Sequence, residues 1–244
     1  MSTLRKNTKT IILALLLMIL LASSILSTLA DPIGFTITST STENASPQSA
    51  ATMTTAGGTF TTLLLNATMQ TPRWKAYVGN VSGRFSLRDA LNFTLYDWNI
   101  TTIAGEIYAS RNSSPTWANI RCANNSTVIT EQTQLNITTT KEDSINRTFH
   151  NYTHKGFYVG TTLIANSTCR AISTYVNNTK QTTGEAASFQ EILLSDSTDR
   201  VIYATILENK VQSYNNNNFD FQMIVAESEY LLTPSTYYFW VELS

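Results

Sequence analysis

The sequence predicts an all-β protein, namely an antiparallel β-sandwich of the immunoglobulin-like or jelly-roll-like kind, forming one domain after an N-terminal signal or anchor segment. Thr, Ser and Asn supply 39, 24 and 21 of the 244 residues, and Thr in particular favours strands. Short β-forming runs recur roughly every 10–20 residues with polar breaks between them, which is typical of antiparallel sandwiches. A charged fraction of 14%, with nine Gly and five Pro, excludes coiled-coil and collagen-like chains.

The first thirty residues predict a secretory signal peptide. Arg5, Lys6 and Lys9 precede an apolar run over residues 11–22, and a small-residue cleavage site ends at Ala30. Residues 11–30 are also just long enough to span a bilayer uncleaved, so an N-terminal anchor is the alternative and the one expected membrane contact. Cleavage leaves 13 basic and 17 acidic side chains, a net charge of −4, which gives no reason to expect a nucleic-acid partner.

N-glycosylation sequons are the second sign of export. By composition, 21 Asn in this chain give about five N-x-S/T triplets, yet thirteen are present, and none lies after residue 177. We expect several to carry glycans, whereas Thr-rich strands that form sequons as a by-product are the alternative. The thirteen candidate glycosylation sites are Asn44, Asn66, Asn80, Asn92, Asn99, Asn112, Asn124, Asn125, Asn136, Asn146, Asn151, Asn166 and Asn177.

The chain has two cysteines, Cys122 and Cys169. An even count in an exported chain predicts a disulfide between them, and two free buried thiols are the alternative. No C-x-x-C motif occurs, so the cysteines predict neither a thioredoxin-type redox site nor a c-type haem.

Three regions follow from the pattern along the chain: the signal or anchor over 1–30, a Ser/Thr-rich arm or linker over 31–55, and the β domain over 56–244. The arm contains a short strand-like piece, residues 34–38, which we expect to be free to pair with a neighbouring molecule. Within the domain, strands are expected over 59–65, 74–79, 85–87, 93–96, 103–109, 117–122, 156–163, 169–176, 219–225 and 237–243.

The clearest hairpin joins strands over 189–195 and 200–207 through the polar turn 196–199. Residues 185–194 also show helical spacing, but the turn that follows at once favours a strand in their second half. Residues 123–155 hold five sequons and both histidines, and we expect a long glycosylated loop there.

Candidate chemistry is sparse, and we expect no cofactor, no metal site and no catalytic residue. His150 and His154 have no acidic residue between them, and on a strand they would lie about 13 Å apart, so surface loop positions are expected. Exposed aromatic side chains in a sandwich stack on sugars, which makes Trp74 and Trp98 candidate ligand-stacking residues, although Trp more often fills the core. Carboxylates for a glycosidase-like pair exist, but the sequence does not pair them: Asp89, Asp97, Glu106, Glu191, Glu208, Asp220 and Glu227.

Residues 71–98 carry a Trp, then a turn reading Tyr-x-Gly-Asn-Val-Ser-Gly, a Leu-x-Asp-Ala strand and a Tyr-x-Trp end. Together with residues 220–227 and 237–243, this segment resembles archaeal exported β-rich surface glycoproteins of unknown function. The resemblance implies an archaeal secreted or cell-surface β-protein. It implies no catalytic residue.

These observations favour a non-enzymatic function outside the cell. The leading hypothesis is a secreted or cell-surface N-glycosylated structural protein, a filament or envelope subunit whose partner is a further copy of itself through strand exchange. An adhesion or carbohydrate-binding module that binds surface glycans is the first alternative. A secreted glycosidase-like hydrolase is the second.

Overall fold

A computed structural model describes residues 31–228 and 234–244 of the chain. Every strand pair in these residues is antiparallel, which confirms the predicted all-β class. The expected signal peptide or anchor, residues 1–30, lies outside the described residues. Within the described part, no helix has the length and apolar character needed to cross a membrane.

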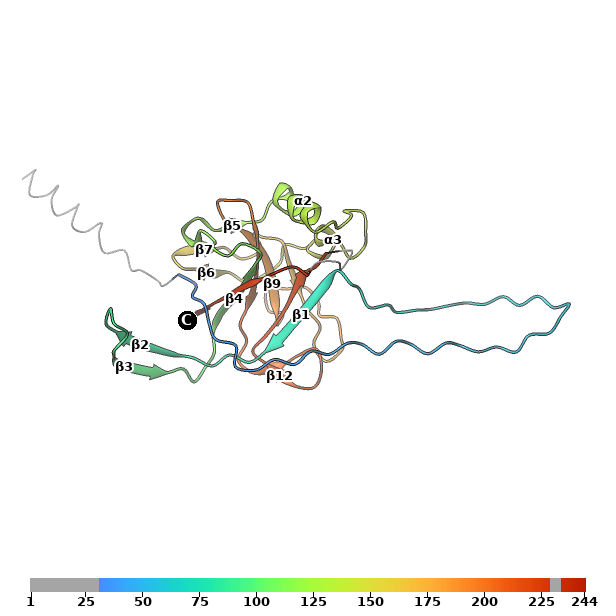
Figure 1. Ribbon diagram of the computed structural model, residues 1–244, viewed down its shortest axis with the longest axis horizontal. Helices are drawn as coiled ribbons and strands as arrows, with labels where there is room; N and C mark the ends of the chain where they lie inside the picture. Colours follow the sequence, from blue (N-terminus) through green and yellow to red (C-terminus); the bar gives the residue numbers. More distant parts are fainter. Residues whose placement is uncertain (1–30, 229–233) are drawn as a thin grey trace, which may run out of the picture.

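The centre of the molecule is a sheet with the strand order β14–β4–β10–β9–β5, in which β8 also pairs with β9 (Figure 1). The expected hairpin is present as β9 and β10, with Val201 opposite Ser195. The strands of the central sheet are β4 (Gly105–Ser110), β5 (Arg121–Cys122), β8 (Ala171–Ser173), β9 (Gln190–Ser195), β10 (Val201–Ile206) and β14 (Tyr238–Leu243).

A short antiparallel pair and two helices cover one face of this sheet. Strand β1 (Trp74–Gly79) pairs with β13 (Phe221–Ala226), and the helices are α2 (Asn125–Gln134) and α3 (Ile145–Thr148). Val128 of α2, Met223 of β13 and Phe149, which directly follows α3, share one apolar cluster with Leu193 and Tyr203 of the sheet. Figure 1 shows both helices lying above the sheet and β1 in front of it.

The opposite face is covered by the hairpin of β6 (Phe157–Val159) and β7 (Thr162–Ile164). Phe157 and Ile164 pack there against Ile192 and Ile202, with Trp117 of the 3-10 turn Trp117–Asn119 at the margin. Because both faces are covered, every residue of β4, β9 and β10 is buried. Two small pairs lie outside this layered body: β2 (Arg84–Arg88) with β3 (Thr94–Asn99), and β11 (Val211–Gln212) with β12 (Asn218–Phe219).

The structure corrects several of the expected elements. Residues 123–155 are not one long loop but contain α2 and α3. Residues 59–65, expected as a strand, form none, whereas residues 34–38 are unpaired beside a single bridge between Ile33 and Val241. The strand expected over 117–122 shortens to β5, the run 156–163 is divided between β6 and β7, and 169–176 shortens to β8.

Candidate assembly surfaces and modification sites

The longest exposed feature is an arm formed by residues 34–70. It leaves the body as one extended run, turns at Gly57 and Gly58, and returns as a second run to β1, with no strand assigned in either run (Figure 1). Gly58 adopts φ +76°, a conformation that favours glycine, so the turn is encoded locally. Every residue of the arm is exposed, including Phe60 at 94% and Leu64 at 101%.

The second exposed feature is the β2–β3 hairpin. Its register places Phe85 opposite Trp98 and Leu87 opposite Tyr96, so these four side chains share one face. They are between 45% and 60% exposed, and none belongs to either apolar core cluster of the body. We call this surface the hairpin apolar face.

The other face of the same hairpin is polar. Arg84 lies opposite Asn99 and Ser86 opposite Asp97, and the Arg84 guanidinium donates to the Asp97 carboxylate at 2.8 Å. The hairpin turn is built by Asp89, whose side chain accepts from the backbone N–H groups of Leu91 and Phe93. The hairpin is thus amphipathic without a core beneath its apolar face.

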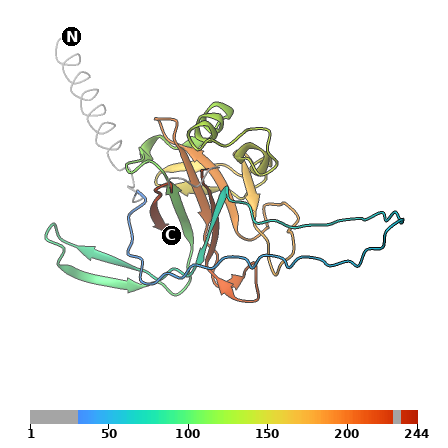
Figure 2. The ribbon, with the colours of Figure 1, turned by 45° about the vertical axis from the view of Figure 1, so that its right-hand side comes forward.

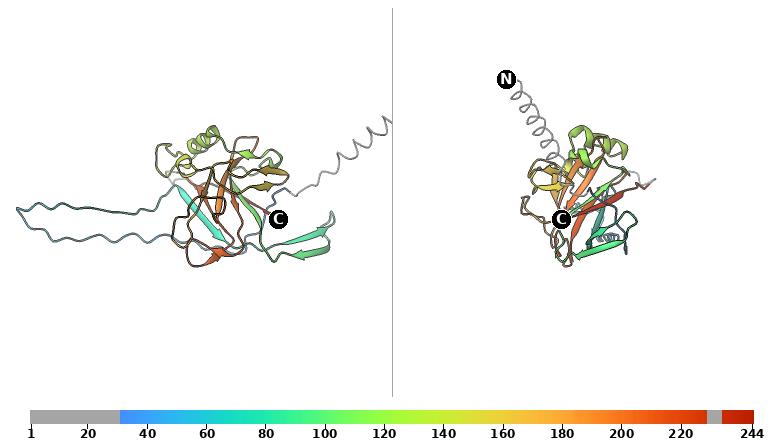
Figure 3. Two further views of the ribbon diagram at one scale, coloured as in Figure 1. Left: turned by 180° about the vertical axis from the view of Figure 1, so that it is seen from behind. Right: turned by 90° about the vertical axis from the view of Figure 1, so that its left-hand side faces the viewer.

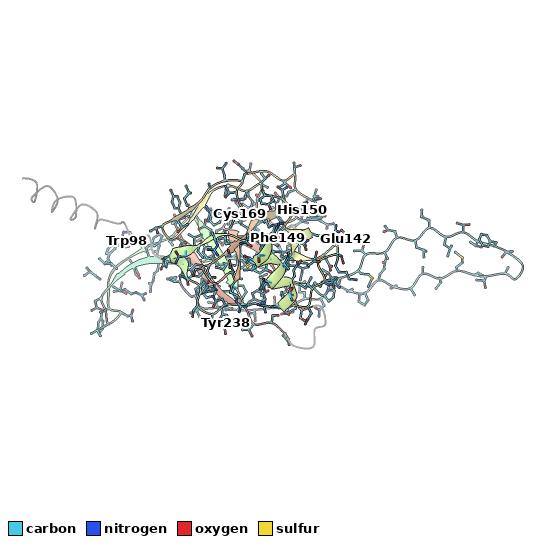
Figure 4. The ribbon with its side chains drawn as sticks, turned by 90° about the horizontal axis from the view of Figure 1, so that it is seen from above. Trp98, Glu142, Phe149, His150, Cys169 and Tyr238 are labelled. Atoms are coloured by element: carbon cyan, nitrogen blue, oxygen red, sulfur yellow. A yellow bond between two sulfur atoms is a disulfide. The ribbon has the colours of Figure 1, made fainter. Side chains whose placement is uncertain are left out.

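The arm and the hairpin project from opposite ends of the body. In Figure 1 the arm runs to the right and the hairpin to the left, and Figure 2, turned by 45°, keeps them apart. The view from behind in Figure 3 and the view from above in Figure 4, where Trp98 is labelled at the hairpin end, show the same separation. Neither element therefore covers the apolar side chains of the other within one molecule.

Free strand edges are the other surfaces at which a chain can dock, and two of them are covered in part by the molecule itself. The outer edge of β13 is capped by side chains: the Glu191 carboxylate accepts from the Ile224 N–H, and the Thr205 hydroxyl donates to the Gln222 carbonyl. At the outer edge of β14, Ile33 exchanges two backbone hydrogen bonds with Val241. Among the described residues β1 pairs with β13 alone, so the outer edge of β1 is unpaired.

The predicted disulfide between Cys122 and Cys169 is present. It links β5 to the segment before β8, and both of these strands pair with β9. Cys169 is fully buried. The bond therefore fixes two neighbouring strands at one border of the central sheet.

The sequon asparagines lie at the surface of the described molecule. Ten are exposed, whereas Asn112, Asn146 and Asn151 are half-buried and none is buried. On the hairpin, Asn92 lies in the turn and Asn99 shares the polar face with Arg84, so no sequon falls on the hairpin apolar face. On the arm, Asn44 and Asn66 flank the tip. Glycans on these sites would leave the arm tip and the hairpin apolar face uncovered.

The two candidate ligand-stacking tryptophans lie in different environments. Trp74 is half-buried, its indole N–H donates to the Asp143 carbonyl at 2.7 Å, and its ring lies 6.1 Å from that of Phe149. Trp74 therefore has a packing role. Trp98 is 51% exposed, and its ring makes an edge contact with Tyr96, with 4.9 Å between the ring centroids.

The two histidines also lie in different environments. His150 is exposed, as expected, and lies with Glu142 at a surface hollow beside α3 (Figure 4). His154 is fully buried, so its expected surface position is wrong. Its Nε2 atom accepts from the backbone N–H groups of Thr168 and Cys169 at 3.2 and 2.9 Å. In residues 31–228 and 234–244, no cluster of three His, Cys, Asp or Glu side chains is arranged to hold a metal ion.

Two carboxyl groups come together in the central sheet, where Glu106 is buried and Glu242 is half-buried. Glu106 and Glu242 are opposite one another in the β4–β14 pair, and the Glu242 carboxylate accepts from the Gly160 N–H in the turn between β6 and β7. Burial, and then the neighbouring Glu242, raise the pKa of Glu106 to about 8. Glu242 was not among the carboxylates that the sequence singled out. Of the candidates, Glu191 is buried at the β13 edge and Asp97 is paired on the hairpin.

Comparison with known proteins adds no name to these features: no protein-family model, curated protein or solved structure matches the chain. The sequence predicts an arm over residues 31–55 and the β domain from residue 56, whereas the exposed arm extends to residue 70. It places the hairpin within that domain without predicting an exposed apolar face. One signal was available in the sequence: the single charged residue between 34 and 70 is Glu43, which is unusual for a segment fully exposed to water.

Proposed function

We propose that this chain is an exported, N-glycosylated structural protein of the cell surface whose copies assemble into a filament or envelope layer by exchanging extended segments. The observation that carries the proposal is the arm, because it exposes Phe60, Leu64 and Leu65 almost fully to water and Leu63 by about half. Apolar β-forming runs with unpaired backbone groups add readily to other chains, and natural proteins protect them. An arm of this kind has a function only if another surface covers it.

Geometry favours a polymer over a closed dimer. A two-fold dimer uses the same patch on both copies, whereas a contact between two different patches joins copies head to tail and continues unless the rotation closes a ring. The arm and the hairpin are different patches at opposite ends of the body (Figure 3). Head-to-tail growth is the assembly that they support.

Chemistry of the surface supports a location outside the cell. The Cys122–Cys169 disulfide is of the kind that persists in oxidising compartments. All thirteen sequon asparagines in the described residues reach the surface, and ten of them are exposed. With the predicted leader over 1–30, these features support secretion and glycosylation.

Electron microscopy of the full chain, produced in a host that glycosylates and processes it, tests the proposal. We expect filaments or sheets from the unchanged chain. A variant with Phe60, Leu63, Leu64 and Leu65 replaced by Ser keeps the arm length, and we expect it to remain monomeric with an unchanged melting temperature. A matched control replaces Thr61 and Thr62 by Ser and should assemble. Dispersed monomers from the unchanged chain would contradict the proposal.

A second candidate function, a carbohydrate-binding or adhesion module, is favoured by one observation. Tyr96 and Trp98 form an exposed aromatic pair on the hairpin apolar face, and aromatic faces of this kind stack on sugar rings. Binding of soluble oligosaccharides, lost on Trp98→Ala and retained on Trp74→Phe, would support this candidate over assembly.

A further inference from the structure

We propose that the acceptor for the arm is the hairpin apolar face of the next copy, so that residues 59–65 of one molecule lie across Phe85, Leu87, Tyr96 and Trp98 of another. This inference rests on the proposed function and identifies the contact by which the copies join. It commits to one occupant, a second copy of this chain.

The hairpin needs a cover that its own molecule does not supply. An isolated two-stranded hairpin is marginally stable in water, and a third strand or a packed layer is needed to hold it. Phe85, Leu87, Tyr96 and Trp98 are exposed and belong to neither apolar core cluster of the described residues. The hairpin nevertheless has a defined register, with the Arg84–Asp97 ion pair on its polar face.

The arm has the chemistry that this face requires. The hairpin apolar face carries no charged side chain, so a charged segment lying on it would lose hydration without gaining a partner. From residue 34 to residue 70 the arm carries only Glu43, and residues 59–65 carry no charge. The run Thr59–Leu65 also has strong β propensity and no backbone pairing in its own molecule, so it can add to a free edge of the hairpin.

Sequon placement favours the same contact. The arm sequons at Asn44 and Asn66 bracket residues 47–65, which include the apolar run and the Gly57–Gly58 turn. The hairpin sequons, Asn92 and Asn99, lie in the turn and on the polar face. A glycan on any of these four sites would border the proposed contact without covering it.

The size of the contact is small, which fits a joint that is repeated along a polymer. Three aromatic side chains and one Leu, each about half exposed, offer roughly 400 Å² of apolar surface, the size of a functional patch on a monomer. A matching area on the arm gives roughly 800 Å² in total, below a standard stable interface.

Cross-linking between two singly labelled chains tests the contact directly. Full-length chains carrying Leu64→Cys are mixed with chains carrying Trp98→Cys under assembly conditions and treated with a short bismaleimide. The matched control pairs Leu64→Cys with Arg84→Cys, which lies on the opposite face of the same hairpin. We expect at least a tenfold higher yield of the linked unlike pair for Trp98→Cys than for Arg84→Cys.

A second variant keeps the test independent of the label. Phe85→Lys combined with Trp98→Lys should abolish assembly, whereas Arg84→Lys should not, and all variants should retain the Cys122–Cys169 bond and the same melting temperature. Assembly of the double-Lys variant, or equal cross-linking on both hairpin faces, would overturn the hairpin contact and leave the proposed function standing. Loss of oligosaccharide binding from a double-Lys variant that still assembles would overturn it in favour of a glycan-binding face. No assembly by the unchanged chain would overturn both proposals.

Discussion

A single buried side chain, His154, holds the segment that carries half of the disulfide. Its Nε2 atom accepts from the Thr168 and Cys169 N–H groups, and its Nδ1 atom lies 2.8 Å from the Lys155 carbonyl oxygen. An acceptor at Nε2 and a carbonyl partner at Nδ1 together require the neutral tautomer with its proton on Nδ1. The imidazole thus replaces a backbone carbonyl as the partner of two N–H groups.

Replacing His154 with Ala would leave the Cys169 N–H without an acceptor in the interior, whereas the N–H of the exposed Thr168 can turn to water. An unmet buried donor costs about 1–3 kcal/mol, so we expect His154→Ala to lower the free energy of unfolding by about 1–3 kcal/mol. Urea denaturation with the disulfide intact measures this loss. The exposed His150→Ala is the matched control and should change stability by less than about 0.5 kcal/mol. Equal effects of the two substitutions would show that the hydrogen bonds of His154 do not stabilise the fold.

At the scale of the element, helix α2 owes its start to one sequon residue. The Asn124 side chain accepts from the Thr127 N–H at 2.9 Å as the N-cap. Asn124→Ala removes both the cap and the sequon, whereas Asn124→Asp keeps the cap and removes only the sequon. We expect Asn124→Ala to be less stable than Asn124→Asp by about 1 kcal/mol in urea denaturation. Similar stability of the two variants would show that any loss of stability comes from the missing glycan and not from the missing cap.

The same helix shows why part of the fold cannot be predicted from the sequence. The α2 sequence contains three Thr and two Gln among its ten residues, so it lacks the continuous apolar stripe of a typical surface helix. Val128 reaches the core, and the buried Glu131 is held by a bidentate hydrogen bond from Arg111, twenty residues earlier in the chain. Contacts between residues this far apart in the sequence stabilise a helix whose local propensity is weak.

Contacts distant in sequence also determine which β-forming runs become strands. The hairpin of β9 and β10 was predictable, because two apolar runs flank a turn in which the Asp196 side chain accepts from the Thr198 N–H. Residues 59–65 have equal β propensity but no partner in their own molecule, so they form no strand. β propensity reports that a segment suits a sheet, and it does not say which molecule supplies the neighbouring strand.

For the molecule as a whole, the buried carboxyl groups set the pH dependence of stability. Burial raises the pKa of Glu191 well above its usual value, and burial also raises the pKa of Glu242. Glu106 has a pKa of about 8 against 4.5 in an unfolded chain, because burial and Glu242 outweigh the opposite effect of Lys155. The folded state therefore binds more protons than the unfolded state between these pH values, and stability falls as pH rises through them.

Two aspartates act in the opposite direction at lower pH. Burial alone would raise the pKa of Asp143, but hydrogen bonds from Thr71 and Arg73 lower it below 3.8, and hydrogen bonds from Thr198 and backbone groups do the same for Asp196. Their contribution is complete above the unfolded pKa and is lost as the pH falls through their lower folded values. Together the two sets of groups place the maximum of stability at about pH 4–5.

Urea denaturation across pH 3 to 8 measures this profile, and the free energy of unfolding should decline between pH 5 and pH 8. Glu106→Gln keeps the shape of the side chain and removes its titration, so it should flatten the decline by up to about 1.4 kcal/mol per pH unit and stabilise the protein most at pH 8. Glu142→Gln, at an exposed carboxyl, should leave the profile unchanged. A free energy of unfolding that rises from pH 5 to pH 8 would contradict the assignment.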